Sequence, residues 1–380
     1  MLPISAAALA ALGQATARPV RAEWSNDGGQ TWTPAKFGAG SVTPDRTAEV
    51  RYSASVELLD VPRGRSGINS VTTEVRLFQG LGVPRREVEW IPAGRYTIDR
   101  LKRTALGVNL DLLGREDIVR GASFPTARTI GPDSARVCAE ALYAEALPGS
   151  PVSWRKGARG DLPIPAFVVD EDRWAALSGG TDTSGTATGV AASIGAETFC
   201  DARGIPTVAP VPTLADPAVW RIPRQLVTAR PSEEETSENL RNLWVISGDA
   251  GSGDKVVGPV FVWDEDPASM TYAGPDPVDD PLAPQRLGLN VRVRTGRYSS
   301  ALITSLEQAR TVGLARLADS LGVQASLSFS AICNPALEPG DVVEAEVAEG
   351  VWQRHIIDAN PYTLGGITMT CQTRTSTRKV

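Results

Sequence analysis

The chain has 380 residues, with 38 lysines and arginines against 44 aspartates and glutamates, and it holds 28 prolines and 36 glycines. This length exceeds one ordinary hydrophobic core, so we expect two to four domains. The two charge signs are interspersed without a long basic block, which argues against sequence-specific nucleic-acid binding. Frequent Pro and Gly between short apolar runs favour β-sheet with many turns.

The N-terminal segment from Leu2 to Ala17 is mildly apolar, but no Lys or Arg precedes it. A secretory signal begins with a positive region, so we expect none here. No apolar run approaches the ~20 residues that span a bilayer, and we expect no membrane insertion. The segment 1–17 is instead expected to form a helix packed on the body of the protein or on a neighbour.

Two distant stretches follow the same plan. Ile98-Asp99 ends a strand-like run, and Gly107–Leu112 begins eight residues after the Asp. Ile357-Asp358 is followed at the same spacing by Gly366–Cys371. Both copies are preceded by a glycine and an aromatic strand, Gly94-Arg95-Tyr96 and Gly350-Val351-Trp352. A β-hairpin used twice predicts two similar small β-barrels near the two ends of the chain.

The expected fold class is mainly β with α+β insertions. Alternating apolar residues from Val50 to Leu58 predict one face of the first barrel. Apolar residues in Ser134–Leu147 predict a helix that opens a mixed domain. The expected domains are an N-terminal helix at 1–17, a first β-barrel at 18–128, a mixed α/β domain at 129–220, a second β-barrel at 221–246 and 321–376, and a loop-rich insertion with a helix at 247–320.

Further elements can be placed from local patterns. Helices are expected near Asp172 and over Thr188–Ile194, and Glu197–Val208 is expected to form a strand, a tight turn and a second strand. The clearest helix begins at Thr304, where Thr304 and Glu307 form a capping box, and ends at Gly322. Asn242–Ile246 is the clearest strand of the return into the second barrel.

The run Ser25–Trp32 fits the Asp-box pattern Ser-x-Asp-x-Gly-x-Thr-Trp. In such a turn the Asp caps the backbone, Gly takes a positive φ and Trp packs beneath. The pattern recurs once per blade in sialidase-type propellers, where it is structural, and one copy without a repeat favours a plain hairpin. A carbohydrate-binding or glycan-cleaving protein remains the alternative, and so does a secreted adhesin, which would need a signal sequence.

Other candidate residues favour structural roles. His355 is the only histidine and lies in an apolar strand, which favours a structural or surface role over a catalytic base. Four widely separated cysteines are expected to be small buried side chains, although the sequence leaves a disulfide open. These are Cys138, Cys200, Cys333 and Cys371.

Three acidic clusters resemble calcium loops without EF-hand spacing, so a bound cation is the less favoured interpretation. They are Asp170-Glu171-Asp172, Glu233-Glu234-Glu235 and Asp264-Glu265-Asp266. Asp170 or Asp172 is expected to cap a helix. The Gly-rich run Ser247–Gly253 lacks the Lys-Ser/Thr that a phosphate-binding loop needs. We therefore expect no catalytic, cofactor-binding or metal-binding residues and no enzymatic activity.

The order of several motifs resembles phage tail-hub proteins, in particular minor tail proteins of phages that infect actinobacteria. These motifs are Pro3-Ile4-Ser5, Arg18–Trp24, Asp27-Gly28-Gly29, Gly114–Asp117, Asp172-Arg173-Trp174, Phe199–Gly204, and the closing run from Asn334 through Val343 and Ile357-Asp358 to the hairpin Gly366–Arg374. The resemblance extends over nearly the whole chain, and it implies a hub-like architecture similar in plan to a baseplate hub.

The resemblance also implies a function. It implies a homotrimer whose paired barrels form a ring with pseudo-sixfold symmetry, joining the distal tail or tail-tube protein to the tail-tip, spike or fibre proteins. The lumen would pass the tape-measure protein and DNA, and the location would be the virion, after synthesis in the host cytoplasm. The expected contacts between copies are the N-terminal helix (Leu2, Leu9, Leu12) and the hairpin strands at 107–113 and 366–372.

Overall fold

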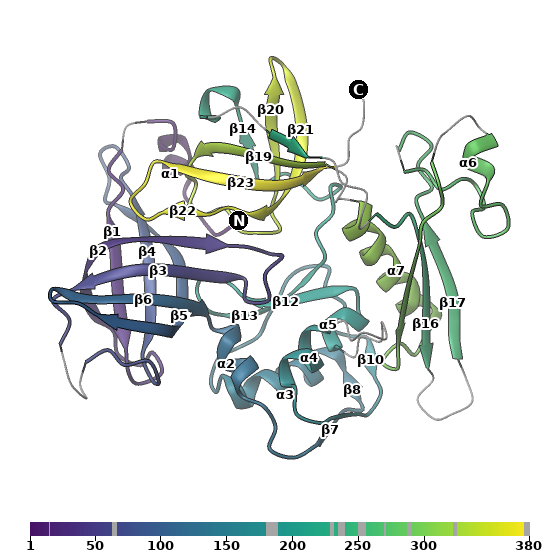
Figure 1. Ribbon diagram of the computed structural model, residues 1–380, viewed down its shortest axis with the longest axis horizontal. Coiled ribbons are helices and arrows are strands. Elements are labelled where there is room, and N and C mark those ends of the chain that lie inside the picture. The colour runs from purple at the N-terminus through teal and green to yellow at the C-terminus, as the bar shows by residue number, and fades with distance from the viewer. Residues whose placement is uncertain are drawn as a thin grey trace.

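The computed structural model describes residues 1–14, 16–62, 67–179, 189–228, 232–234, 240–249, 256–269, 271–286, 291–321 and 325–375. Over these residues the protein is mainly β, as expected, and its largest sheet has 13 strands. The N-terminal barrel and the C-terminal strands lie side by side, and the inserted elements extend to one side of them (Figure 1).

Six strands close the first barrel, because the order β1-β4-β5-β6-β3-β2 returns to β1. Alternate residues of β3, from Tyr52 to Leu58, are buried inside it, as the sequence pattern predicts. Full burial of a Val or Leu side chain, such as Val56 or Leu58, contributes about 1.5–3 kcal/mol. The strands are Val20–Ser25 (β1), Thr33–Pro44 (β2), Tyr52–Leu59 (β3), Glu74–Leu81 (β4), Glu89–Arg103 (β5) and Gly107–Gly114 (β6).

The N-terminal helix α1 spans Ala6–Ala11 and is shorter than expected. Ser5 Oγ caps it by accepting a hydrogen bond of 3.1 Å from the Ala8 N–H. Leu2 and Leu12 are only 4% and 2% exposed because they pack into the core of their own chain. The prediction that this apolar face contacts another copy is therefore wrong for these two residues.

The second strand group repeats the strand order of the first barrel. Its order β20-β21-β23-β19 matches β4-β5-β6-β3, and the neighbours are antiparallel in both sets. The strands are β14 (Trp220–Ile222), β15 (Ser232–Glu234), β19 (Ala325–Ile332), β20 (Val342–Ala348), β21 (Val351–Ala359), β22 (Tyr362–Thr363) and β23 (Thr368–Thr375). The duplication expected from the two similar hairpins is thus present in the topology.

One segment contacts both outer strands of the second group. It runs from β14, which pairs with β20, through the 3-10 turn η1 (Arg224–Leu226), to β15, which pairs with β19. Between them Val227 forms a bridge with Ala331 of β19. The same segment therefore borders both outer strands of the repeated order, as β1 and β2 together do in the first barrel, and this second strand group is called the second barrel from here on.

Strand β22 joins the two groups into one sheet. Val42 and Ser41 of β2 pair with Tyr362 and Thr363 of β22, and β22 in turn pairs with β23. The Leu364 N–H extends the contact by donating to the Gly40 carbonyl at 2.9 Å. Backbone hydrogen bonds therefore hold the two barrels in a fixed orientation.

A mixed α/β domain follows the first barrel and has its own core around Leu142 and Tyr143. Its longest helix is α3, which Ser134 caps close to the predicted start. The predicted pair of strands at Glu197–Val208 is present as the antiparallel pair β12 and β13. The elements are α2 (Glu116–Gly121), β7 (Arg128–Ile130), β8 (Asp133–Ser134), α3 (Ala135–Ala146), β9 (Ser153–Trp154), β10 (Pro163–Ile164), β11 (Phe167–Val169), α4 (Arg173–Ser178), α5 (Val190–Ser193), β12 (Ala196–Cys200) and β13 (Pro206–Pro210).

An inserted domain lies between β15 and β19. It is a three-stranded sheet of order β17-β16-β18 with helix α7 packed on it. Leu243–Ile246, expected in the second barrel, belongs to this sheet, because an apolar strand pattern does not specify which strands it pairs with. The elements are β16 (Leu243–Asp249), β17 (Val256–Trp263), α6 (Ala283–Arg286), β18 (Thr295–Ser300) and α7 (Leu306–Leu321).

The cap of α7 lies one residue later than predicted. Ser305 Oγ accepts from the Gln308 N–H at 3.1 Å, and Gln308 Oε1 accepts from the Thr304 N–H at 2.9 Å. Glu307 instead accepts from Arg159 at 3.1 Å. The expected stop at Gly322 lies outside the described residues.

Candidate functional site: a charged junction between the barrels and the inserted elements

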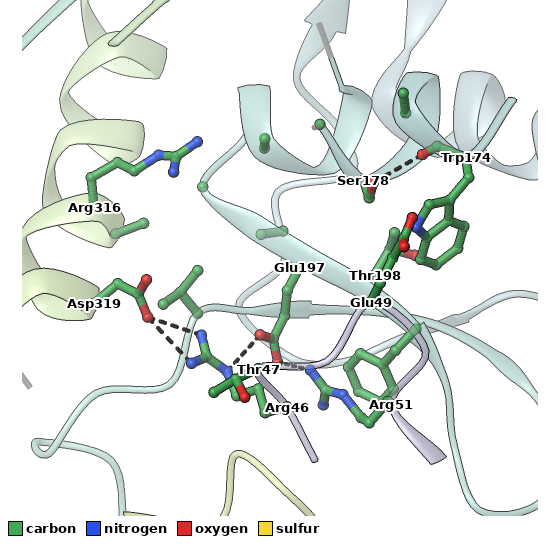
Figure 2. Close-up of a pocket in the computed structure, with 18 of the residues that line it drawn as sticks. Arg46, Thr47, Glu49, Arg51, Trp174, Ser178, Glu197, Thr198, Arg316 and Asp319 are labelled. Carbon is green, nitrogen blue, oxygen red and sulfur yellow. Dashed lines mark hydrogen bonds and ion pairs between the residues drawn. The ribbon is translucent and has the colours of Figure 1, made fainter. Parts of the chain in front are cut away.

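A cleft of about 650 Å³ lies where the first barrel, the mixed domain and the inserted domain meet. The turn between β2 and β3 forms its floor, β12 and α4 form one wall, and α7 forms the other (Figure 2). Arg316 from α7 and Trp174 from α4 line it on opposite sides. The cleft is therefore built from segments that are far apart in the sequence.

Arg46 is the centre of the charged floor. Its Nε donates to Glu197 Oε2 of β12 at 2.7 Å, and both terminal nitrogens donate to Asp319 Oδ1 of α7 at 3.2 Å. Glu197 Oε1 lies 2.8 Å from Arg51, whose guanidinium stacks on the Phe199 ring at 3.5 Å. One arginine from the first barrel thus binds carboxylates of both neighbouring domains.

The second barrel completes the junction. Arg374 of β23 donates to Asp319 Oδ1 at 2.7 Å, and its other terminal nitrogen lies 2.9 Å from Asp358 Oδ1 without hydrogen-bonding geometry. Arg46 Nη1 lies 3.9 Å from the same Asp358 oxygen. Three arginines (Arg46, Arg51, Arg374) therefore face three carboxylates (Glu197, Asp319, Asp358).

Burial and the neighbouring arginines act in opposite directions on the pKa values of Glu197 and Asp358. Burial acts to raise the pKa of Glu197, but Arg46 and Arg51 outweigh it and hold that pKa below its ordinary value. Burial raises the pKa of Asp358 to about 7, and the Arg46 guanidinium only partly opposes this rise. Asp358 therefore changes its charge near neutral pH, while Glu197 stays ionised.

The chemistry of the junction is that of an attachment between domains. Removing one partner of a buried ion pair typically costs about 3–5 kcal/mol, because the other charge is left uncompensated. Each of the three carboxylates lies within ion-pair distance of at least one arginine. These ion pairs connect four parts of the chain, namely the first barrel, the second barrel, the mixed domain and the inserted domain.

The Asp-box run forms the turn between β1 and β2. Asp27 accepts hydrogen bonds from Ser25 Oγ at 2.6 Å and from the Thr31 N–H at 3.0 Å, and these contacts lower its pKa. The Trp32 ring packs against the guanidinium groups of Arg76 and Arg95, with centroid distances of 4.2 and 5.3 Å. The motif acts here as a hairpin turn, as expected.

The single histidine and the four cysteines are all buried. His355 Nδ1 lies 3.1 Å from Thr373 Oγ1, and burial lowers the pKa of His355 to about 4. The four cysteines are free thiols, which confirms their expected role as small buried side chains and leaves the disulfide alternative without support.

The acidic clusters serve the backbone where the structure describes them. Asp172 caps α4 by accepting from the Ala175 N–H at 2.8 Å, as predicted. Asp264 Oδ1 accepts from the Asp266 N–H at 3.2 Å, and Asp264 Oδ2 accepts from the Thr271 hydroxyl at 2.6 Å. Among the described residues no three Asp, Glu, His or Cys side chains are grouped to hold a metal ion. Glu235 and part of Ser247–Gly253 lie outside those residues.

Sequence reasoning did not identify the junction. In the sequence, Asp358 is notable only as part of the repeated hairpin, and Glu197 only as part of an expected strand. A weak signal was nonetheless present, because Glu197 and Arg374 are single charges inside strands that are otherwise mostly buried. A charge in such a position needs a partner.

Neither a protein-family model nor a curated protein sequence matches the chain. Among the helices of the described residues, none is long and apolar enough to cross a membrane. Similar solved structures exist. The tail protein from Neisseria meningitidis MC58 aligns with a TM-score of 0.58 and 12% identity, over 95% of this chain and 97% of that one.

Two further solved structures agree. The 43 kDa tail protein of prophage MuSo2 from Shewanella oneidensis has a TM-score of 0.53 and 11% identity, over 94% of this chain and 98% of that one. An E. coli type VI secretion component, described as similar to the T4 bacteriophage tail proteins gp27 and gp5, has a TM-score of 0.50 and 9% identity. The alignment covers 94% of this chain and 79% of that one. The chain therefore has the fold of phage tail proteins over nearly its whole length.

Proposed function

We propose that this chain, which has the fold of phage tail proteins, is a structural subunit of a phage tail tip or baseplate. In detail, it is a homotrimeric hub ring that joins the sixfold tail tube or distal tail protein to threefold tip, spike or fibre proteins. The ring leaves a channel for the tape-measure protein and DNA. The protein is located in the virion, at the tail tip.

The observation that carries this proposal is the repeated strand order, β4-β5-β6-β3 and β20-β21-β23-β19, on a chain with a tail-protein fold. Two similar barrels per chain allow three chains to present six similar units, which is the arrangement needed to meet a sixfold tube. The β2–β22 pairing supports it, because it sets the first barrel-to-barrel contact within one chain.

We also propose that the protein works by assembly and without catalysis. The charged groups of the junction support this, since Arg46, Glu197 and Asp319 are used in ion pairs between parts of the chain. The elements that extend away from the barrels, namely the mixed domain and the inserted domain, are the surfaces proposed for tip or fibre proteins.

Light scattering behind a sizing column, followed by negative-stain class averages, tests the proposal. A mass of about three times the 40.2 kDa chain mass, with closed rings that have a central hole, is the expected result. A chain that stays monomeric at every concentration and when mixed with the tail-tube protein would contradict the hub. A glycan-binding screen is the parallel test of the carbohydrate-binding alternative.

A further inference from the structure

The outer face of β1, β4 and β5 carries a row of arginine and aromatic side chains that stack on one another. Arg21 of β1 lies over the rings of Phe78 and Trp90, with centroid distances of 4.2 and 4.9 Å. Arg76 of β4 lies over the rings of Trp32 and Phe78, with centroid distances of 4.2 and 5.4 Å. The chain neighbours of Arg76 are buried, so alternation along the strand directs the row outward. These five residues are called the arginine face.

The charge that reaches the solvent on the arginine face is mainly positive. The side chains of Arg21 and Arg76 are 40% and 34% exposed, whereas that of Glu23, which pairs with both, is only 12% exposed. A guanidinium stacked on a ring can still donate hydrogen bonds in its own plane to a carboxylate. Tryptophan and arginine are also enriched among the residues that carry the binding energy of protein interfaces. The face therefore suits an acidic surface that also offers apolar side chains.

A loop with this complementary chemistry lies in the inserted domain, just before α6. Its side chains Val278 and Leu282 are 39% and 58% exposed. The exposed aspartates Asp276 and Asp279 lie between and beside them in the sequence. Large apolar side chains exposed together are typical of a surface that binds another protein. The segment Asp276–Leu282 is called the acidic loop.

The arginine face and the acidic loop lie at opposite ends of the molecule. The first barrel forms one end of the long axis, and α6 lies at the other end (Figure 1). A contact between the two surfaces therefore requires two copies of the chain. Such a contact joins two different surfaces, and contacts of this kind close into a ring when the rotation between copies permits.

We propose that the arginine face of one copy binds the acidic loop of a second copy. The arginines pair with Asp276 and Asp279, and Val278 and Leu282 pack against the aromatic rings. This inference rests on the proposed ring and adds a contact between its subunits. It uses only the loop before α6, so the three-stranded sheet and the mixed domain remain the surfaces proposed for tip or fibre proteins.

The test uses two double variants of the full chain. Arg21→Gln with Arg76→Gln alters the arginine face, and Asp276→Lys with Asp279→Lys alters the acidic loop. Sedimentation velocity over a dilution series measures the association of each. We expect each double variant to associate about tenfold or more weakly than the unaltered chain, because each removes the attraction between the two surfaces. Urea denaturation establishes that both variants are folded.

Two single variants on other parts of the first barrel are the matched controls. Arg100→Gln removes an arginine whose side chain is 78% exposed and lies 4.0 Å from Asp111. Asp60→Lys reverses the charge of an aspartate whose side chain is 74% exposed and lies 3.3 Å from Lys36. Both controls are expected to associate like the unaltered chain.

Mixing the two double variants tests whether these two surfaces bind each other. Each variant lacks a different surface, so an equimolar mixture contains one intact pair of surfaces. We expect dimers in the mixture at a concentration at which neither folded variant associates alone. A mixture that stays monomeric overturns the contact while leaving a trimeric ring in place, and so do double variants that associate like the unaltered chain. An unaltered chain that never associates overturns both the contact and the ring.

Discussion

Arg46 and Asp319 are 273 positions apart in the sequence, yet both terminal nitrogens of the arginine donate to one oxygen of the aspartate at 3.2 Å. The contact attaches helix α7 of the inserted domain to the first barrel. Arg374 of the second barrel donates to the same oxygen at 2.7 Å. Asp319 is therefore the point at which both barrels hold the inserted domain.

Arg46→Met is expected to destabilise the fold strongly. It leaves Glu197 with Arg51 alone and removes the contact with Asp319, so we expect a loss of about 3–5 kcal/mol in the free energy of unfolding. Urea denaturation measures it. The matched control is Lys36→Met, whose ion pair with Asp60 is exposed and should be worth about 0–1 kcal/mol. Equal urea midpoints for the two variants would contradict the role of the junction.

Asp358→Asn is expected to change how stability depends on pH. The pKa of Asp358 is 3.8 in a free chain and about 7 when folded, so between these values the folded state keeps a proton that the unfolded state has released. Stability present at low pH is therefore lost as the pH rises from about 4 to about 7.

The asparagine side chain cannot ionise, so the variant should gain stability relative to the unaltered chain as the pH rises. The gain is at most ~1.4 kcal/mol per pH unit, and the 20% exposure of the Asp358 side chain reduces it. Denaturation at pH 4.5, 6 and 8 measures it. A constant difference between the two proteins would show that Asp358 is ionised throughout.

His355 is expected to remain neutral in the folded protein at pH values where a free histidine is protonated. Burial lowers its pKa from 6.5 to about 4, so stability present above pH 6.5 is lost as the pH falls towards 4. It is the only histidine, so its imidazole carbon-bound protons give an isolated NMR signal. That signal should not shift between pH 8 and pH 5, whereas a shift with a midpoint near 6.5 would place the ring in contact with water.

Ser305→Ala is expected to weaken helix α7. Its hydroxyl accepts from the Gln308 N–H, and loss of such a cap typically costs about 0.5–2 kcal/mol. Glu307→Ala is the comparison, because Glu307 is 71% exposed and pairs only with Arg159 in the described residues, which predicts about 0–1 kcal/mol. A larger loss of stability for Glu307→Ala than for Ser305→Ala would instead support the Thr304–Glu307 cap that the sequence predicts.

Local patterns predicted much of the fold. The alternation from Tyr52 to Leu58 identified a barrel strand, because burial of every second residue is a property of the strand itself. The pair β12–β13 and the cap of α4 by Asp172 were predictable for the same reason. The resemblance to tail-hub proteins, carried by the order of motifs, is supported by the tail-protein fold.

Long-range relationships were not predictable from one sequence. Nothing in the local pattern says that Arg46 meets Asp319, or that Leu243–Ile246 pairs with β17 and β18. The expected helix at residues 1–17 was longer than the observed α1, because the apolar composition extends past Ala11, where the helix ends. Leu12, the residue after it, is buried in the core. Which residues meet across the junction is determined by how the domains pack together, and a local sequence pattern does not contain that information.

The inserted domain starts and finishes at one place. Ser320 Oγ near its end donates to the Arg241 carbonyl near its start at 2.8 Å, so about 80 residues leave and rejoin the second barrel at adjacent points. An element attached in this way behaves as an exchangeable module, because its length can change without moving the strands on either side. Replacing the segment between Arg241 and Ser320 by one of another length would therefore leave the strands of both barrels in place.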